Sequence, residues 1–274
     1  MIPWLTANAP FPPLGRALHS PNGLLAAGGD LSATRLLEAY RRGIFPWFNP
    51  GDHILWWSPD PRMVLVPGEF KISRSLAKVL RNAAYEVRCD TAFEQVMRGC
   101  AAPRPSHNPV GQSGGCDTLL AKPADCGSSR PAALPAPEGS ASPCQGGTWI
   151  HEDMIAAYCT LHEQGYAHSV ETWMGGNLVG GLYGIAIGRM FYGESMFSQA
   201  GNASKIALAH LARQLERWQA DQPNKGMIDC QMNTAHLASL GAREIPRSEF
   251  IARLQELINC EPVTHWQLDA DLFT

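Results

Sequence analysis

The segment MIDCQM, residues 227–232, carries a carboxylate and an amide two positions apart. If this segment is a strand, its side chains alternate, so Asp229 and Gln231 share one face while Cys230 points to the other. A carboxylate is costly to bury unless a polar or cationic group meets it there. We therefore expect Asp229 and Gln231 to line a functional site.

The segment FYGESMFS, residues 191–198, raises the same question, because Glu194 places a second carboxylate in an apolar strand. Regular alternation puts Tyr192, Glu194, Met196 and Ser198 on one face and Phe191, Gly193, Ser195 and Phe197 on the other, unless Gly193 introduces a bulge. Two acidic strand positions with apolar neighbours are typical of a site that receives an amine.

Other reactive side chains do not form a comparable group. A Cys between Asp and Gln suggests a thiol nucleophile, but alternation turns Cys230 away from both, and no His is its neighbour in sequence, so we expect no covalent role. Cys116, Cys126, Cys144 and His107 match no compact zinc spacing and are expected to hold no metal. His168 and His236 are expected to be structural.

Composition bounds the class of protein. The chain has 274 residues, 45% of them hydrophobic, which is enough for two domains with cores of their own. Its net charge of -3 means that any nucleic-acid binding must use a local basic patch. The start, MIPWLTANAPFPP, lacks the pattern of a signal peptide, and no apolar run approaches the roughly 20 residues of a membrane span. We expect a cytoplasmic protein with reduced thiols.

Residues 1–62 are rich in Pro, Gly and Trp and predict a small N-terminal domain. The stretch LSATRLLEAYRRG predicts one helix within it, opened by Ser32 and ended by Gly43. Trp56 and Trp57 are expected in the core. Trp47 lies in an irregular segment, where an exposed ring could stack on a base.

The stretch FKISRSLAKVLRNAAYEV, residues 70–87, predicts a helix with one basic and one apolar face. The basic positions are Lys71, Arg74, Lys78 and Arg81, and the apolar positions are Ile72, Leu76, Val79 and Ala83. Charge runs are usually solvated faces, but this stripe contains no acid in a chain that is acidic overall. Phosphate binding and a solvated face both remain open.

Residues 101–147 interrupt the pattern. More than half of them are Pro, Gly, Ser or Ala, and none is aromatic. Such a composition buries too little apolar surface to offset the entropy of ordering, so it predicts a disordered insertion. We expect the insertion to be dispensable for chemistry.

The remaining elements predict an α+β arrangement of the N-acetyltransferase type. Three strands form an antiparallel meander and are followed by a helix, a further strand and a last helix. The predicted order is a helix in 147–167 that ends at Gly165, strands 167–174, 177–187 and 189–198, helix 202–219, strand 227–232 and helix 248–258.

Taken together, the motifs resemble those of the leucyl/phenylalanyl-tRNA-protein transferase family. The segments that carry the resemblance are NGLLAAGGDLSATRLLEAYRRGIFPWF, ILWWSPDPRMVL, GTWI, LVGGLYGIAIGRMFYGESMFS, NASKIAL, IDCQ and HLASLGAREIPR. The resemblance implies transfer of leucine or phenylalanine from tRNA to the N-terminal arginine or lysine of a protein, which marks that protein for degradation. It also implies no metal or nucleotide cofactor, and a small domain (1–62) followed by an N-acetyltransferase-like domain (63–274) that the insertion interrupts.

The resemblance also assigns residues. It implies that Asp229 and Gln231 stand beside the attacking amine, with Glu194 nearby. The aminoacyl side chain would enter a pocket of Leu182, Gly193, Met196, Ser198, Leu208 and Ile228. Trp47 and Trp149 would flank the terminal adenosine. Apart from the resemblance, Tyr40 and the basic stripe Lys71, Arg74, Lys78 and Arg81 are expected to contact the tRNA. Members commonly have methionine at the position of Leu182, and their link to GTWI is only a few residues long.

The implied reaction is aminolysis of an ester, which needs orientation more than base catalysis. Gln231 can accept a hydrogen bond from the amine, Asp229 can orient Gln231, and Glu194 fits recognition of a cationic side chain or support of that pair. The proton acceptor remains open between these side chains and the tRNA ribose.

Two other functions are weighed against transfer. A coenzyme A-dependent N-acetyltransferase needs a glycine-rich pyrophosphate loop, for which Gln199-Ala200-Gly201-Asn202 is a weak match. A tRNA-binding module without catalysis would leave Asp229 and Glu194 unexplained.

Overall fold

The computed structural model describes residues 2–82, 84–103, 148–221 and 226–273. From residue 104 onward, the predicted insertion 101–147 lies outside the described residues. Ala101, which we assigned to the insertion, is instead the last residue of a helix. No helix in the described ranges is long and apolar enough to cross a membrane.

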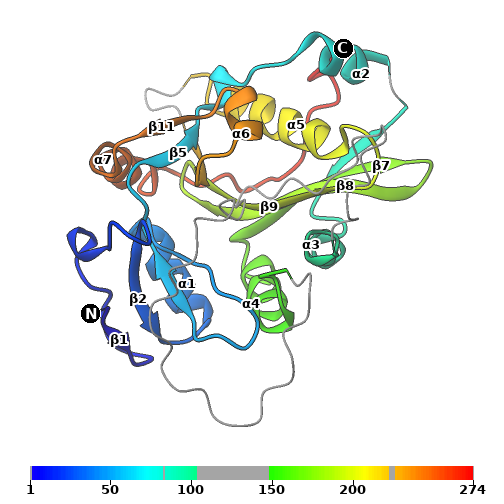
Figure 1. The fold of residues 1–274 in the computed structure, drawn as a ribbon. Helices are drawn as coiled ribbons and strands as arrows, with labels where there is room; N and C mark the ends of the chain where they lie inside the picture. Colours follow the sequence, from blue (N-terminus) through cyan, green and yellow to red (C-terminus); the bar gives the residue numbers. More distant parts are fainter. Residues whose placement is uncertain (1, 83, 104–147, 222–225, 274) are drawn as a thin grey trace.

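The N-terminal part folds around a four-stranded sheet of very short strands (Figure 1). In sheet order these are β1 (Trp4–Leu5), β2 (Leu24–Gly28), β4 (Leu55–Trp57) and β3 (Phe45–Pro46), with the 3-10 turn η1 at Leu14–Arg16. The predicted helix is α1 (Ala33–Arg41); Ser32 caps it by accepting from the Arg35 N–H at 3.3 Å, and Gly43 follows it with φ +72°. Trp56 and Trp57 are buried, as predicted.

The larger part contains a seven-stranded mixed sheet in the order β11-β5-β10-β9-β8-β7-β6. The predicted meander is confirmed as β7 (Ala167–Met174), β8 (Asn177–Ile187) and β9 (Met190–Ser198). The strand of the MIDCQM segment is β10 (Met227–Gln231), which pairs in parallel with β9 and antiparallel with β5 (Arg62–Leu65). Short strands β11 (Arg243–Ile245) and β6 (Glu86–Cys89) form the edges.

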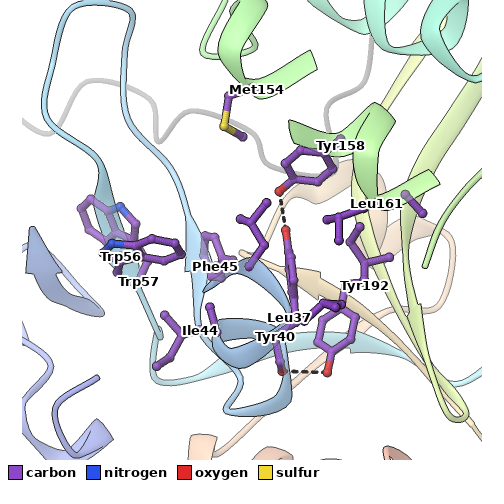
Figure 2. Close-up of a cluster of buried hydrophobic side chains, with 14 of the residues drawn as sticks. Leu37, Tyr40, Ile44, Phe45, Trp56, Trp57, Met154, Tyr158, Leu161 and Tyr192 are labelled. Atoms are coloured by element: carbon purple, nitrogen blue, oxygen red, sulfur yellow. Dashed lines mark hydrogen bonds between the residues drawn. The ribbon is translucent and has the colours of Figure 1, made fainter. Parts of the chain in front are cut away.

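Helices cover both faces of this sheet (Figure 1). One face, here called the α5 face, is covered by α5 (Ala203–Trp218) and α6 (Ala235–Ser239), with α2 (Arg74–Asn82) packed on α5 and the turn η2 at Pro67–Glu69. The other face, here called the α4 face, is covered by α3 (Phe93–Ala101), α4 (Glu152–Glu163), α7 (Arg247–Leu257) and the N-terminal part. Figure 2 shows the aromatic core on this second side, where Tyr40, Tyr158 and Tyr192 gather.

The basic helix differs in one respect from its prediction. Because α2 begins at Arg74, Lys71 and Ile72 precede it and the helical periodicity does not apply to them. Ile72 is 41% exposed, so it does not lie on the packed apolar face where the helical pattern placed it. Leu76 and Leu80 are buried against Ile206 of α5, and Ala83 lies outside the described residues.

A bulge in β9 changes the predicted faces. Tyr183 pairs with Ser195 and the next residue, Gly184, pairs with Gly193, so Glu194 is the extra residue. As a result Phe191 and Met196 pack in the α5-side core, whereas Tyr192 and Phe197 pack in the other core. Regular alternation, which would put Phe191 and Phe197 on one face, therefore does not hold, and the alternative of a bulge does, although the extra residue is Glu194 and not Gly193.

A second bulge lies in β10. Asp229 pairs with Val64 and Gln231 with Met63, so Cys230 is the extra residue. Gln231 has φ 56°, the left-handed region that few non-glycine residues adopt. Asp229 pairs with Val64 of the α4-side core, whereas Gln231 pairs with Met63 of the α5-side core, to which Cys230 also belongs. The prediction that Asp229 and Gln231 share a face turned away from Cys230 was therefore wrong, because the bulge interrupts the alternation after Asp229.

Candidate functional site

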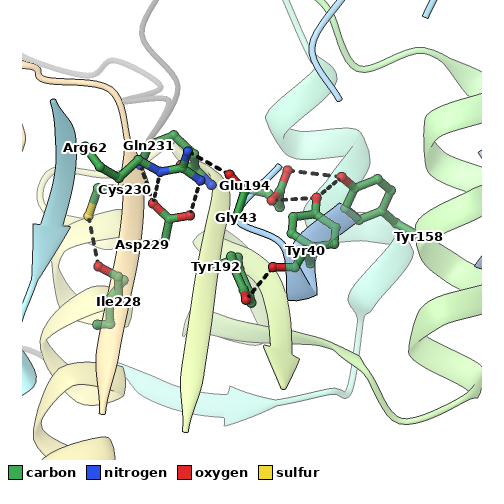
Figure 3. A network of polar contacts seen from close by, with 10 residues as sticks. All are labelled: Tyr40, Gly43, Arg62, Tyr158, Tyr192, Glu194, Ile228, Asp229, Cys230 and Gln231. Carbon is green, nitrogen blue, oxygen red and sulfur yellow. Dashed lines mark hydrogen bonds and ion pairs between the residues drawn. The ribbon is translucent and has the colours of Figure 1, made fainter. Parts of the chain in front are cut away.

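The site lies where the parallel strands β9 and β10 stop pairing. Their last residue pair is Tyr192 with Asp229. Glu194 and Gln231 each follow two residues later on their strands. Glu194, Asp229 and Gln231 are all fully buried, and Figure 3 shows the three near one another. The structure thus brings together the three residues that the sequence singled out.

Asp229 is paired with Arg62, the first residue of β5. Arg62 Nε donates to Asp229 Oδ1 at 2.8 Å, and Nη2 donates to Oδ2 at 2.6 Å (Figure 3). Both side chains are 0% exposed. The fork geometry of arginine fits a carboxylate with two parallel hydrogen bonds. Arg62 is therefore the cation that a buried Asp229 requires.

The Arg62 guanidinium is fixed by further contacts. Its Nη1 donates to the Gly43 carbonyl at 3.2 Å. Its carbon lies 4.8 Å from the ring centroid of Phe45 and 4.6 Å from that of Phe250. The sequence analysis missed Arg62, although an arginine at the head of the apolar run RMVLV carries a signal: a buried acid needs a cation, and few cations lie in apolar strands.

Glu194 belongs to a second polar cluster with two tyrosines. Its Oε1 accepts from Tyr40 at 2.8 Å and its Oε2 accepts from Tyr158 at 3.1 Å, and the two tyrosine hydroxyls contact each other (Figure 3). Burial raises the pKa of Glu194 to about 8, although the two tyrosine hydrogen bonds act in the opposite direction.

The proton count of this cluster agrees with a protonated Glu194. Three O···O contacts join the carboxyl group and the two hydroxyls. If Glu194 is ionised, it accepts from both tyrosines and no proton is left for the contact between the two hydroxyls, whereas a protonated Glu194 donates to one tyrosine, which then donates to the other. Burial also raises the pKa of Tyr40 and Tyr158, so both remain donors.

Tyr40 does not lie at the surface where tRNA contact was predicted. It is fully buried, its hydroxyl is bound by Glu194, and its carbonyl accepts from the Tyr192 hydroxyl at 2.8 Å. Tyr40 lies on the buried side of α1, so its expected contact with tRNA is not supported by its position. Tyr158, which the sequence analysis did not single out, is its partner on α4.

Gln231 is held by its backbone and not by its side chain. Its N–H donates to Asp229 Oδ1 at 2.9 Å. Its side-chain Oε1 and Nε2 are buried and make no hydrogen bond to the described residues. A buried amide without partners costs roughly 1–3 kcal/mol, and such groups concentrate at functional sites. The arrangement offers one acceptor and one donor at the end of the parallel pairing.

Four predicted aminoacyl-pocket residues, Leu182, Met196, Leu208 and Ile228, pack together in the α5-side core. They are fully buried, and Leu182 pairs with Met196 across the meander. Gly193 sits beside the bulge, opposite Gly184. Ser198 is half-buried; its hydroxyl donates to the Ala200 carbonyl at 2.9 Å and accepts from the Ser204 N–H at 3.2 Å, so it supports the start of α5.

The other predicted tRNA contacts form two separate groups. Trp47 is half-buried with its ring 5.5 Å from that of Trp57, and Trp149 is mostly buried in the same α4-side core. Phe48 and His151, the neighbours of these segments, contact each other at 5.1 Å between ring centroids. The basic residues Lys71, Arg74, Lys78 and Arg81 are exposed on or before α2, on the α5 face.

Cys230 has the surroundings of a structural thiol. It is fully buried, and burial together with the Asp229 charge raises its pKa far above the usual range. His168 binds Asp90 at 2.8 Å and stacks on Trp266, away from the site. Within the described ranges, no three His, Cys, Asp or Glu side chains gather as a metal site would require.

Comparisons with known proteins agree on one family. Residues 64–110 and 138–255 match the family model described as leucyl/phenylalanyl-tRNA protein transferase, and residues 29–60 match the model of its N-terminal domain. The leucyl/phenylalanyl-tRNA–protein transferase of Nitrosospira multiformis is 58% identical over 94% of this chain and 93% of its own. That of Nitrosomonas europaea is 58% identical over 94% and 91%, and that of Thiobacillus denitrificans 57% over 91% and 90%.

Proposed function

Because the chain belongs to the leucyl/phenylalanyl-tRNA protein transferase family, we propose that it moves leucine or phenylalanine from aminoacyl-tRNA to the N-terminal arginine or lysine of acceptor proteins. It is an aminoacyltransferase that acts from tRNA onto protein. The choice of arginine and lysine, and the marking of the product for degradation, are the finer parts of the proposal.

One observation carries the proposal: Glu194, Asp229 and Gln231 converge where β9 and β10 cease to pair. An acid and an unpartnered amide at one point of a sheet suit a reaction in which an amine must be aimed. Neither would be needed by a module that only binds tRNA.

The reaction balances without a redox or metal step. The neutral α-amine attacks the ester carbonyl, a C–N bond forms, the ester C–O bond breaks, and the terminal ribose hydroxyl of the tRNA leaves with a proton. An α-amine has a pKa of about 7.7–8.0, so a useful fraction is neutral in the cell. Orientation alone is worth roughly 7–11 kcal/mol when two reactants are well placed.

Gln231 suits the orienting role. Its Oε1 has no partner among the described residues, so it is free to accept a hydrogen bond from the incoming amine. An amide oxygen that accepts one N–H directs the nitrogen lone pair toward the ester carbon. Asp229 acts indirectly: its Oδ1 accepts from the Gln231 backbone N–H and so holds Gln231 in place.

Glu194 suits recognition of the acceptor's cationic side chain. With a pKa of about 8 the carboxyl is mostly neutral at pH 7, which makes its burial tolerable. The approach of a guanidinium or ammonium group lowers that pKa, so the carboxyl ionises when its partner arrives. An uncharged acceptor side chain cannot offset the cost of ionising the buried Glu194, so such acceptors should bind more weakly.

The fold and substrate surfaces complete the proposal. We place the domain boundary directly before β5, one residue earlier than the expected 62/63, because Arg62 already pairs in the larger sheet. We assign an N-acetyltransferase-like fold to the part that follows, supported by the meander followed by a helix and a strand parallel to β9. Leu182, Met196, Leu208 and Ile228, with Gly193 and Ser198 beside them, would receive the aminoacyl side chain. Trp47 and Trp149 would flank the terminal adenosine, and the α2 face would meet phosphates.

A transfer assay tests the proposed function. The purified protein is incubated with radiolabelled leucyl-tRNA and a peptide that begins with arginine. Labelled peptide is expected without acetyl-coenzyme A, and the same peptide acetylated at its N-terminus should remain unlabelled. Binding of leucyl-tRNA without transfer, or dependence on acetyl-coenzyme A, would contradict the proposal.

A further inference from the structure

Arg62 and Asp229 form an ion pair that no solvent reaches. Each side chain is 0% exposed, and two short hydrogen bonds join them. A buried ion pair is weak support for stability, because the cost of removing two charges from water offsets most of their attraction. Its position beside the site therefore calls for a different role.

Asp229 also binds the backbone of Gln231. Asp229 Oδ1 accepts from Arg62 Nε at 2.8 Å and also from the Gln231 N–H at 2.9 Å. That second bond spans the β10 bulge and holds Gln231 at φ 56°. A left-handed conformation costs a non-glycine residue of the order of 1 kcal/mol or more, so it persists only where its surroundings enforce it.

We propose that Arg62 is a positioning residue of the transferase: through Asp229 it fixes the bulge of β10 and so sets the direction of the Gln231 side chain. The proposal rests on the proposed function, because it assigns the supporting structure of the same site. Arg62 does not touch the substrates in this scheme.

The surroundings of Arg62 explain why the residue is an arginine. The groups around its guanidinium come from separate segments: Asp229 on β10, the Gly43 carbonyl after α1, and the rings of Phe45 and Phe250. A planar guanidinium can donate hydrogen bonds to the carboxylate and the carbonyl while its flat faces contact the two rings. An ammonium group keeps the charge but has neither the fork nor the flat faces.

The same hydrogen bonds define the role of Asp229. Its two oxygens already receive three N–H donors from Arg62 and Gln231. An incoming amine would have to compete with a bidentate arginine for them. Asp229 is thus an anchor for Gln231, and the proton of the attacking amine leaves by another route.

Arg62→Lys tests the proposal while keeping the charge. We expect kcat to fall at least tenfold, with KM for leucyl-tRNA and for the peptide unchanged and with the shape of the pH profile unchanged. The Gln231 backbone amide should exchange its hydrogen faster than in the wild type. The matched control is Arg35→Lys, because Arg35 is also buried and lies over a ring, that of Phe11, but is remote from Asp229; it should keep kcat and the Gln231 exchange rate.

A double variant decides the question if Arg62→Lys does not fold. Arg62→Met with Asp229→Leu replaces the pair by apolar side chains, a change that buried pairs often tolerate. We expect a folded protein with tRNA affinity near normal and kcat at least tenfold lower. A folded double variant with wild-type kcat would overturn the proposal, and so would an Arg62→Lys protein with wild-type kcat and exchange.

The pH profile of kcat distinguishes a positioning role of Arg62 from the alternative that Asp229 is the general base. If Asp229 were the general base, Arg62→Lys would displace the limb of the profile that reports the base, and the proposal would fail. Failure of the proposed function gives a different result, since the wild type itself would then transfer no leucine while its Gln231 amide stayed protected.

Discussion

Tyr192 and Asp229 face each other as the last residue pair of the parallel strands β9 and β10. Both strands are irregular directly beyond this pair, with a bulge at Glu194 on β9 and at Cys230 on β10. The first bulge leaves Glu194 without a partner residue on β8, and the second shifts the register of Gln231 on β5. The polar groups of the site are thus placed by defects in the sheet.

Replacing Gln231 by leucine should stabilise the protein and slow transfer. The substitution removes two buried polar atoms that have no partner among the described residues and keeps a similar volume. We expect a higher melting temperature and a single-turnover rate at least tenfold lower, which corresponds to about 1.4 kcal/mol in the barrier.

Gln214→Leu is the control for that prediction. Gln214 is equally buried, but its amide binds Asp269 at 3.1 Å through Nε2 and at 2.7 Å through Oε1. This variant should lose stability and keep its transfer rate. A Gln231→Leu protein less stable than the wild type would show that the amide has a structural partner.

Glu194 should make acceptor binding depend on pH. Since its pKa is raised to about 8, the carboxyl is protonated below that pH and charged above it. Only the charged form attracts a cationic side chain, so KM for an arginine-starting peptide should fall as the pH rises from 6.5 through about 8 and level off roughly one pH unit higher.

Glu194→Gln isolates this effect from the peptide's own amine, which also loses its proton near pH 8. The variant should show a higher KM with a weaker pH dependence, measured with the same peptide. Parallel KM curves for the two proteins would rule out recognition by the Glu194 charge.

Tyr40→Phe should change the acceptor step and leave tRNA binding intact. The substitution removes a hydroxyl that binds Glu194 at 2.8 Å and helps to keep the pKa of that carboxyl down. We expect the fall in KM to occur at a higher pH than in the wild type. Filter binding of leucyl-tRNA should be unchanged; a tenfold loss of tRNA affinity would restore Tyr40 to the tRNA surface.

Neutralising Arg74, Lys78 and Arg81 should weaken all tRNAs alike. The three side chains are exposed on α2 and form no ion pair with any residue that the structure describes. If each binds a phosphate, the log-log salt slope of binding should flatten by at most about one unit for each phosphate that is no longer bound. Arg16→Ser, an exposed change in the N-terminal part, serves as the control. An unchanged slope in the triple variant would make this face a solvated one.

The elements with long periodic patterns could be predicted from the sequence. Helix α5 and the meander β7 to β9 have enough residues for their periods to be read, and each begins and ends close to its predicted place. The strands of the N-terminal part span two to five residues, too few for a period to show.

The site was predictable only in part. Glu194, Asp229 and Gln231 stand out because acids and amides are costly in apolar strands. Arg62 and Tyr158 lie far from them in sequence, and only the packing of the strands and of α4 brings them into contact. The glycine in FYGESMFS indicated a possible bulge in β9, but MIDCQM contains no such residue, so the bulge in β10 could not be predicted from a period-two pattern.

Gly43 lies between Arg62 of β5 and the residues Phe250 and Ile251 of α7, so a substitution there would disturb the support of the site. It has φ +72°, its carbonyl binds Arg62, and a Cβ atom there would lie 2.6 Å from Ile251 Cδ1 and 2.9 Å from Phe250 Cε1. An alanine would strain the backbone and press the Phe250 ring toward the guanidinium without altering any group that touches substrate. Gly43→Ala should therefore lower the temperature at which the protein loses transfer activity, which would make it a candidate temperature-sensitive allele.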